Sequence, residues 1–114
     1  MNVDIKKVKI HVFVPEEKLS EIRDAVCHAG AGIIGNYTYC TTSSKTTGTF
    51  KPNDKANPYI GTNNTLEFVE EIDLGFICDI KHVKNILKII RDIHPYEEPA
   101  IDIIPILEES CFKK

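Results

Sequence analysis

The feature that most constrains the fold of this chain is a pattern that occurs twice, in which a strand-like segment is followed by a helix-like one. Hydrophobic residues first alternate with a period of two at 8–14 and then recur at helical spacing from Leu19 to Ala29. The same two periods return at 65–76 and at 83–93. Each occurrence predicts a β-strand that leads into an amphipathic α-helix.

Residues at the ends of the predicted helices support this interpretation. Pro15 suits the first turn of a helix, and Gly30-Ala31-Gly32 favours the left-handed conformation that ends one. Asp79 is placed to cap the second helix. The hydrophobic stripe of that helix consists of Val83, Ile86, Leu87, Ile90 and Ile93. The His94-Pro95 pair ends the helix, and 100–106 supplies a last strand.

Between the two patterns the sequence predicts a second strand and a long loop. Residues 33–41 place Tyr37 and Tyr39 on one face of a strand. Residues 42–64 show no hydrophobic period and are rich in turn-forming residues, which predicts a long polar loop with room for a short hairpin at 48–51. A loop of this length in a small domain is typical of a functional segment.

The predicted third strand, 65–76, has a mixed pattern. One face consists of Leu66, Phe68, Ile72 and Leu74, and the other of Glu67, Val69 and Glu71. Glu70 interrupts the apolar face. We therefore expect either a partner for its carboxylate or a bulge in the strand at this point.

Together these elements predict an α+β domain with the ferredoxin-like order strand, helix, strand, strand, helix, strand. Its sheet has four antiparallel strands, and both helices cover one face. The first and second strands run parallel to each other and against the third and fourth. We expect a single domain over 1–114, with a core at about 8–107 and the long loop at 42–64.

This topology brings two unusual segments to one edge of the sheet. The long loop leaves from the edge at which the first strand ends and the last strand begins. The corner His94-Pro95-Tyr96-Glu97-Glu98-Pro99 lies at the same edge, and its two prolines stiffen it. We therefore predict a small-molecule or metal site between the 42–64 loop and the corner.

The other face of the predicted sheet has no helix to cover it. Its members include His11, Phe13, Val69, Ala100 and Ile104. Large apolar patches are rarely left exposed to water, so we expect this face to pack against other subunits of a homo-oligomer.

Composition and charge argue against several classes of partner. The net charge of -3 and the lack of a Lys/Arg stripe disfavour binding to nucleic acid or to an anionic membrane. No hydrophobic run is long enough for a membrane span, and residues 1–7 lack the pattern of a signal peptide, so we expect a cytoplasmic protein. The four cysteines form no Cys-x-x-Cys pair, which disfavours a zinc or redox motif.

Each polar residue of the corner has a functional and a structural interpretation. An unperturbed imidazole titrates near neutral pH, so His94 suits a divalent metal or a proton-transfer site, but it equally suits a cap of the preceding helix through a bond to one of its terminal carbonyl groups. Glu97 and Glu98 are further candidate ligands of a metal, although neighbours in an extended segment point opposite ways, so at most one shares the side of His94. Tyr96 suits packing with its hydroxyl bonded.

Four spaced motifs resemble a known family. They are Gly35-Asn36-Tyr37-(x)2-Cys40, Gly48-Thr49-Phe50-(x)5-Ala56-Asn57-Pro58-(x)2-Gly61, Glu67-Phe68-Val69-Glu70-Glu71 and His94-Pro95-Tyr96-Glu97-Glu98-Pro99-Ala100. Their combination closely resembles the domain inserted in the middle of many Nif-three-like proteins, which are often labelled type-two GTP cyclohydrolases. The resemblance runs from about Lys9 to Leu107, and we expect the chain to be a standalone version of that inserted domain.

The resemblance implies a fold similar to that of the trimeric PII and CutA proteins, and a trimer built on the uncovered sheet face. In such trimers the long loop lies beside a cleft between subunits, which PII proteins use for small molecules. The ligand-binding candidates are then Asn36, Tyr37, Gly48, Phe50, Asn57 and Gly61, beside His94, Tyr96, Glu97 and Glu98. The metal-binding residues of the Nif-three-like proteins lie in the flanking halves, which this chain does not contain, so the cyclohydrolase activity does not follow from the resemblance.

We therefore expect a homotrimeric binding or regulatory module of unknown ligand, with its site between the loop and the corner. Two alternatives stay open. One is an assembly or interaction module that partners a metal-binding Nif-three-like protein, and the other is a metal-dependent nucleotide hydrolase. The sequence specifies no nucleophile with a base and no phosphate-binding glycine motif, so an enzyme is the less favoured hypothesis.

Overall fold

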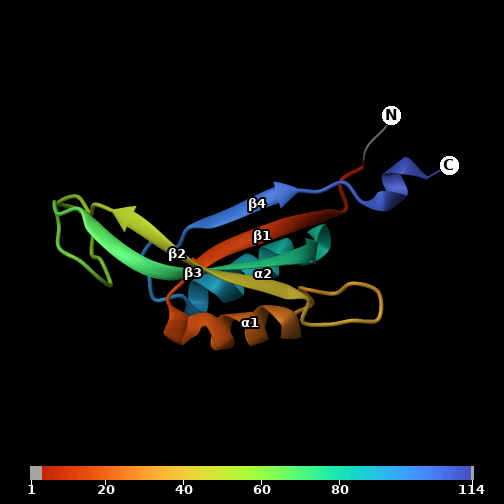
Figure 1. Cartoon of the computed structure of the whole chain (residues 1–114), viewed down its shortest axis with the longest axis horizontal. Helices are drawn as coiled ribbons and strands as arrows, with labels where there is room; N and C mark the ends of the chain where they lie inside the picture. Colours follow the sequence, from red (N-terminus) through yellow and green to blue (C-terminus); the bar gives the residue numbers. More distant parts are fainter. Residues whose placement is uncertain (1–3, 114) are drawn as a thin grey trace.

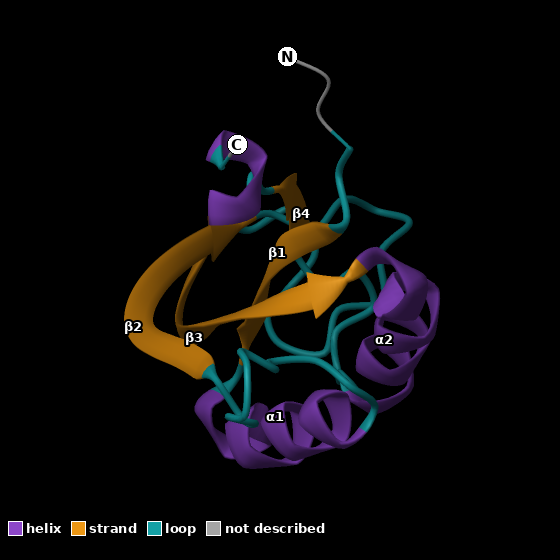
Figure 2. Cartoon of the chain, turned by 90° about the vertical axis from the view of Figure 1, so that its right-hand side faces the viewer, coloured by secondary structure: helices purple, strands orange, loops and turns teal. Residues whose placement is uncertain are grey.

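Four strands form one antiparallel sheet, and two helices lie on one of its faces (Figures 1 and 2). The computed structural model describes residues 4–113. The elements are β1 (Lys7–Val14), α1 (Leu19–His28), β2 (Thr41–Phe50), β3 (Glu67–Asp79), α2 (Ile80–Ile93) and β4 (Ile101–Pro105). The strand order is β2-β3-β1-β4, with every neighbouring pair antiparallel. This arrangement confirms the predicted ferredoxin-like fold.

The core lies between the sheet and the two helices. Along β1 every second residue, from Val8 to Val14, is buried, as the period of two predicts. Opposite them pack Ile22 and Val26 of α1 and Ile86 and Ile90 of α2, all with no exposed surface. The alternating strand and the helical stripe therefore meet on the faces that the sequence predicts.

The helix ends also follow local sequence signals. A short 3-10 turn at Glu16–Lys18 follows Pro15, and Gly30 ends the first helical segment with a φ of +108°. Asp79 caps α2 as predicted, because its Oδ1 accepts a hydrogen bond from the Lys81 N–H at 3.1 Å. The helix then stops at His94, whose backbone is extended.

The predicted position of the second strand is wrong, and with it the extent of the long loop. Residues 31–40 form the connection after α1, while β2 occupies Thr41–Phe50, and the loop covers 51–66. The expected hairpin at 48–51 is absent, because Gly48 pairs with Val69 in a regular ladder. β2 shows no hydrophobic period because it is an edge strand with mostly exposed side chains, and its threonines suit extended backbone.

Strand β3 has the predicted faces but neither of the features expected around Glu70. Its pairing with β2 is continuous, with Glu70 opposite Thr47, so the strand has no bulge there. Glu70 is exposed to solvent and needs no buried partner. The reason is its position along the strand, since the helices cover β3 only from Ile72 onward.

The β2–β3 pair continues beyond the rest of the sheet as a two-stranded arm. Val14, the last residue of β1, pairs with Ile72, so residues 67–71 of β3 pair with β2 alone. The arm and the 51–66 loop at its tip form one end of a molecule that is 55 Å long (Figure 1). The connection at 31–40 lies at the other end of the long axis.

The sheet face opposite the helices has no covering element within the described part of the chain. The residues predicted for this face, His11, Phe13, Val69, Ala100 and Ile104, range from half-buried to exposed. His11 Nδ1 lies 2.8 Å from Oδ1 of Asp73 on the neighbouring strand.

Among residues 4–113, no helix is long and apolar enough to cross a membrane. Residues 1–3, part of the segment tested for a signal peptide, and residue 114 lie outside the described residues.

Candidate functional site

His94 lies at the base of the corner and ties it to the end of β1. Its Nε2–H donates to the Phe13 carbonyl at 2.7 Å, and its Nδ1 accepts from the Tyr96 N–H at 3.2 Å. Only 6% of the residue is exposed, and burial lowers the pKa of the imidazole, opposed in part by the bond to the carbonyl. This pair of bonds requires a neutral ring with its proton on Nε2.

Both ring nitrogens of His94 are therefore occupied by backbone groups of the same chain. A metal ion would have to displace one of them. Glu97, the second predicted metal ligand, points its Oε1 at the backbone of the 51–66 loop instead. Within residues 4–113, no group of three or more His, Cys, Asp and Glu side chains is placed to hold a metal ion.

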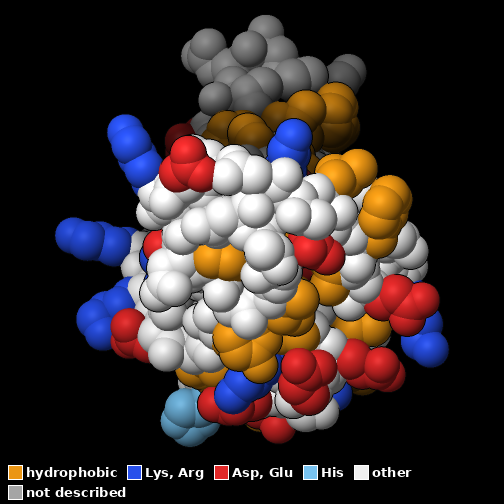
Figure 3. Space-filling view, turned by 90° about the vertical axis from the view of Figure 1, so that its left-hand side faces the viewer, with side chains coloured by type: hydrophobic (Ala, Val, Ile, Leu, Met, Phe, Trp, Pro, Cys, Tyr) orange, Lys and Arg blue, Asp and Glu red, His pale blue; other side chains and the backbone are white. Residues whose placement is uncertain are grey.

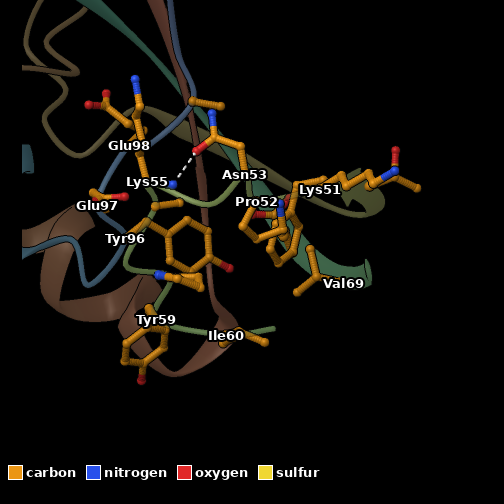
Figure 4. Close-up of a pocket in the computed structure, with 16 residues that line it drawn as sticks. Lys51, Pro52, Asn53, Lys55, Tyr59, Ile60, Val69, Tyr96, Glu97 and Glu98 are labelled. Carbon is orange, nitrogen blue, oxygen red and sulfur yellow. Dashed lines mark hydrogen bonds between the residues drawn. The ribbon is translucent and has the colours of Figure 1, made fainter. Parts of the chain in front are cut away.

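Tyr96 packs against His94 and directs its hydroxyl into the space under the loop (Figure 4). The two ring centroids are 4.6 Å apart with the rings tilted by 58°, and the centroid of the Tyr59 ring lies 6.0 Å from that of Tyr96. The Tyr96 hydroxyl oxygen is buried and faces the Glu71 carboxylate, but no partner among the described residues has normal hydrogen-bond geometry. Burial is the main cause that raises the pKa of this phenol to about 12, and the charge of Glu71 and the closeness of its carboxylate as an acceptor add to it, so the phenol stays protonated at neutral pH.

The 51–66 loop closes on itself and on the corner. Within the loop, the Asn64 N–H donates to the Pro52 carbonyl at 2.6 Å. The Asn57 N–H then donates to Glu97 Oε1 at 3.1 Å, which links the loop to the corner across 40 residues of sequence. Gly61 has a φ of +95°, and a Cβ atom there would lie 2.8 Å from Cγ of Glu67, so the turn requires glycine.

A cavity of about 550 Å³ lies between the loop, the arm and the corner. Phe50 closes it at the end of β2, Val69 and Glu71 line it from β3, and Tyr96 lines it from the corner. The loop contributes Lys51, Pro52, Asn53, Lys55, Ala56, Pro58, Tyr59 and Ile60. In Figure 4 the Tyr96 hydroxyl points between Pro52, Val69 and Ile60. The lining is mostly apolar with a few polar groups, as is typical of small-molecule sites.

Glu71 is the half-buried charge of the cavity, whereas the other charges lie at its rim. Lys51, Lys55, Glu97 and Glu98 are all exposed. None of the three glutamates forms an ion pair with a basic residue in the described part of the chain. Figure 3, which faces the loop end, shows hydrophobic side chains next to acidic ones.

The structure brings most of the predicted site residues to this end of the molecule. Tyr96, Glu97, Glu98 and Phe50 line the cavity. The backbone of Asn57 bonds to Glu97, and Gly61 packs against the Phe50 ring. Gly48 lies under Glu71, since a Cβ atom on this glycine would be 2.7 Å from Oε1 of the glutamate. His94 supports the cavity wall from behind Tyr96.

Two of the predicted site residues lie elsewhere. Asn36 and Tyr37 belong to the 31–40 connection at the opposite end of the long axis, where Ile34 and Tyr37 exchange two backbone hydrogen bonds (Figure 1). Tyr37 is 75% exposed. Within one chain these residues do not contribute to the cavity.

Sequence reasoning missed most of the cavity lining, including Glu71 and the apolar residues of the loop. A usable signal was present: Pro52, Pro58, Tyr59 and Ile60 are apolar residues within an otherwise polar loop. Because these residues follow no hydrophobic period, the sequence does not show that their side chains point to the same side. Only the folded loop shows that they line one cavity.

The fold and the cavity define a small ferredoxin-like α+β domain with a cavity at one end of its sheet. The chain is similar to curated proteins named GTP cyclohydrolase 1 type 2 homolog, with 46% identity over 102 residues to that of Halalkalibacterium halodurans and 42% over 105 residues to that of Bacillus subtilis. These matches cover 90% and 92% of the chain but 27% and 28% of the relatives, so the chain spans little more than a quarter of their length. No protein-family model matches the chain.

Solved structures give the same picture. A Bacillus cereus protein related to NIF3 superposes with a TM-score of 0.80 and 37% identity over 94% of this chain and 27% of that one. The periplasmic divalent cation tolerance protein CutA from Archaeoglobus fulgidus has a TM-score of 0.68 and 15% identity, over 90% of this chain and 85% of its own. At that identity the likeness to CutA shows the fold alone. The chain thus has a NIF3-like, CutA-like fold, which confirms this part of the resemblance seen in the sequence.

Proposed function

We propose that the chain is a small-molecule-binding module whose site is the cavity between the 51–66 loop, the arm and the 94–99 corner. The observation that carries the proposal is the cavity itself, into which the buried Tyr96 hydroxyl points beside Glu71 without a partner of normal hydrogen-bond geometry among the described residues. An unpaired buried polar group costs roughly 1–3 kcal/mol, and a ligand that bonds to it removes this cost. The cavity volume of about 550 Å³ suits a small organic molecule.

The loop gives such a site a means of regulation. The 51–66 loop is held to the corner by one hydrogen bond, from Asn57 to Glu97, at an exposed position. A ligand in the cavity touches the loop and the corner together, so binding stabilises the closed arrangement of the loop. A change in loop order is a signal that another protein can read.

A thermal-shift screen of metabolites and divalent cations tests the proposal. We expect at least one compound to raise the melting temperature, because a ligand that binds the native state stabilises it. Tyr96→Phe keeps the ring but removes the hydroxyl, and should reduce that shift. Tyr39→Phe makes the same chemical change at an exposed tyrosine of the 31–40 connection, which does not line the cavity, and should leave the shift intact. The absence of any shifting compound contradicts the binding proposal.

The uncovered sheet face favours a second candidate, a module that assembles with further copies of itself. Ile104 of β4 is 47% exposed on this face, and Phe13 of the neighbouring strand β1 is half-buried on the same face. We propose a homotrimer packed on this surface, as the resemblance implies. Native mass spectrometry should then give three times the chain mass of 12.9 kDa, and Ile104→Asp should give single chains. A single-chain mass for the unmodified protein contradicts the assembly.

The remaining hypotheses have less support. The name GTP cyclohydrolase belongs to relatives of which the chain covers little more than a quarter, and we do not propose that activity for this chain. An assay of GTP turnover by the chain, with Mn, Zn or Mg supplied, tests whether the chain has that activity. Partnership with a metal-binding Nif-three-like protein and a cytoplasmic location stay predictions from the sequence.

A further inference from the structure

The charges around the cavity indicate what kind of molecule it accepts, provided that the cavity is a binding site as proposed above. At the rim, Lys51 and Lys55 are matched in number by Glu97 and Glu98, so the rim has no net charge. Glu71 is left as the unbalanced charge, and it is half-buried. A carboxylate that is partly removed from water gains most from a cationic partner, and no basic side chain among residues 4–113 supplies one.

Gly48 of β2 leaves room for the Glu71 carboxylate beside it. Gly48 pairs with Val69 on β3, two residues from Glu71, and its missing side chain leaves the space that the carboxylate occupies. A Cβ atom on Gly48 would lie 2.7 Å from Glu71 Oε1 and would displace the carboxylate. The glycine therefore permits the carboxylate to lie where it does.

Aromatic rings line the same cavity as this carboxylate. Phe50, Tyr59 and Tyr96 all line the cavity, and the Tyr96 phenol is close enough to Glu71 for the two groups to influence each other. Aromatic faces attract an ammonium group, and the apolar loop residues suit an apolar body. The neutral Tyr96 hydroxyl adds an oxygen that accepts a hydrogen bond from an N–H group.

We infer that the cavity selects an organic ammonium compound with an aromatic or apolar body, whose charged nitrogen contacts Glu71 and the Tyr96 hydroxyl.

Calorimetric titration of the full chain with three probes of similar size tests this inference. The probes are 2-phenylethylammonium, the neutral 2-phenylethanol and the anionic 3-phenylpropanoate. We expect the ammonium probe to bind at least tenfold more tightly than the other two. Glu71→Gln should remove this preference while leaving the affinity for the alcohol within twofold. Gly48→Ala, which displaces the carboxylate, should weaken ammonium binding at least threefold.

Glu70→Gln is the matched control. It makes the same change of charge on the adjacent residue of β3, which points to the other face and does not line the cavity. We expect it to leave ammonium binding within twofold of the original.

The outcomes separate this inference from the proposed function. If the alcohol or the anion binds as tightly as the ammonium probe and Phe50→Ala abolishes binding, the cavity is a binding site but the selection for cations is wrong. If Glu70→Gln and Glu71→Gln reduce the affinity for the ammonium probe equally, only the overall charge of the protein matters, and the inference is again overturned. If no probe binds and the metabolite screen is also silent, both proposals fail.

Discussion

Phe76 and Phe68 lie on the same strand and the same face of the sheet, yet their environments are opposite. Phe76 has no exposed surface, whereas Phe68 is 70% exposed. The difference arises because α1 and α2 cover β3 only as far as Ile72, and beyond that point the strand continues in the arm. One half of β3 therefore stabilises the fold, and the other half builds the cavity with Val69 and Glu71.

This division teaches that the hydrophobicity of a strand residue does not reveal its role by itself. The period of two assigns both phenylalanines to one face correctly. What separates them is the length of the helices that lie across the sheet. The following predictions test the division between the two halves, in order of decreasing effect on the free energy of unfolding.

Phe76→Ala should cause the largest loss. Removing a fully buried aromatic ring costs the transfer free energy of its atoms and leaves a cavity, which together destabilise proteins by about 3–5 kcal/mol. Urea unfolding followed by circular dichroism measures the change. A loss below about 1 kcal/mol would show that the core half of β3 is packed less tightly than its burial indicates.

His94→Ala tests the junction between the two halves, where the corner is tied to the end of β1. The substitution removes bonds to Phe13 and Tyr96, each of which contributes about 0.5–1.5 kcal/mol, together with buried contacts. We expect a loss of about 2 kcal/mol. The same urea experiment measures it, and Ser20→Ala on the exposed side of α1 is a suitable control.

The pH dependence of stability gives a separate test of His94. Burial lowers the pKa of His94 below its ordinary value of 6.5, so the unfolded chain takes up this proton more readily than the folded one. The contribution of the neutral histidine is complete above pH 6.5 and is lost as the pH falls toward the lower pKa of the folded state. Between about pH 7.5 and pH 5.5 the original protein should lose more stability than His94→Gln. Equal losses would contradict a buried, neutral histidine.

Asp79→Ala should have a smaller effect at the core end of β3. The carboxylate caps α2 through its bond to the Lys81 N–H, and the loss of such a cap typically costs about 1 kcal/mol. Thermal unfolding measures the change. Asp79→Asn retains a capping oxygen and should recover most of the stability.

Phe68→Ala should have the smallest effect, although it removes as large a ring as Phe76→Ala. Because this ring is mostly in water, we expect a change within about 0.5 kcal/mol. Urea unfolding beside Phe76→Ala gives a direct comparison. A loss approaching that of Phe76→Ala in the isolated chain would mean that the exposed half of β3 also supports the fold.

The candidate site was predicted in part from sequence because its two main segments are unusual locally. The proline-bounded corner and the long segment without a hydrophobic period both stand out without reference to any other part of the chain. Asn36 and Tyr37 were assigned to the same site through the resemblance, and the structure places them at the opposite end. Glu71 was missed because its neighbours Gly48 and Tyr96 come from distant parts of the sequence.

The sequence by itself determined the order of strands and helices, the buried faces of β1, β3 and the two helices, and the cap at Asp79, because these depend on residues within one or two turns of chain. The tertiary structure alone decided where β2 begins, since an exposed edge strand is held by its ladder with β3 and needs no hydrophobic period. It also decided that the arm extends beyond the helices and that the loop closes over Tyr96. Both depend on contacts between segments that are far apart in the sequence, such as the bond from Asn57 to Glu97.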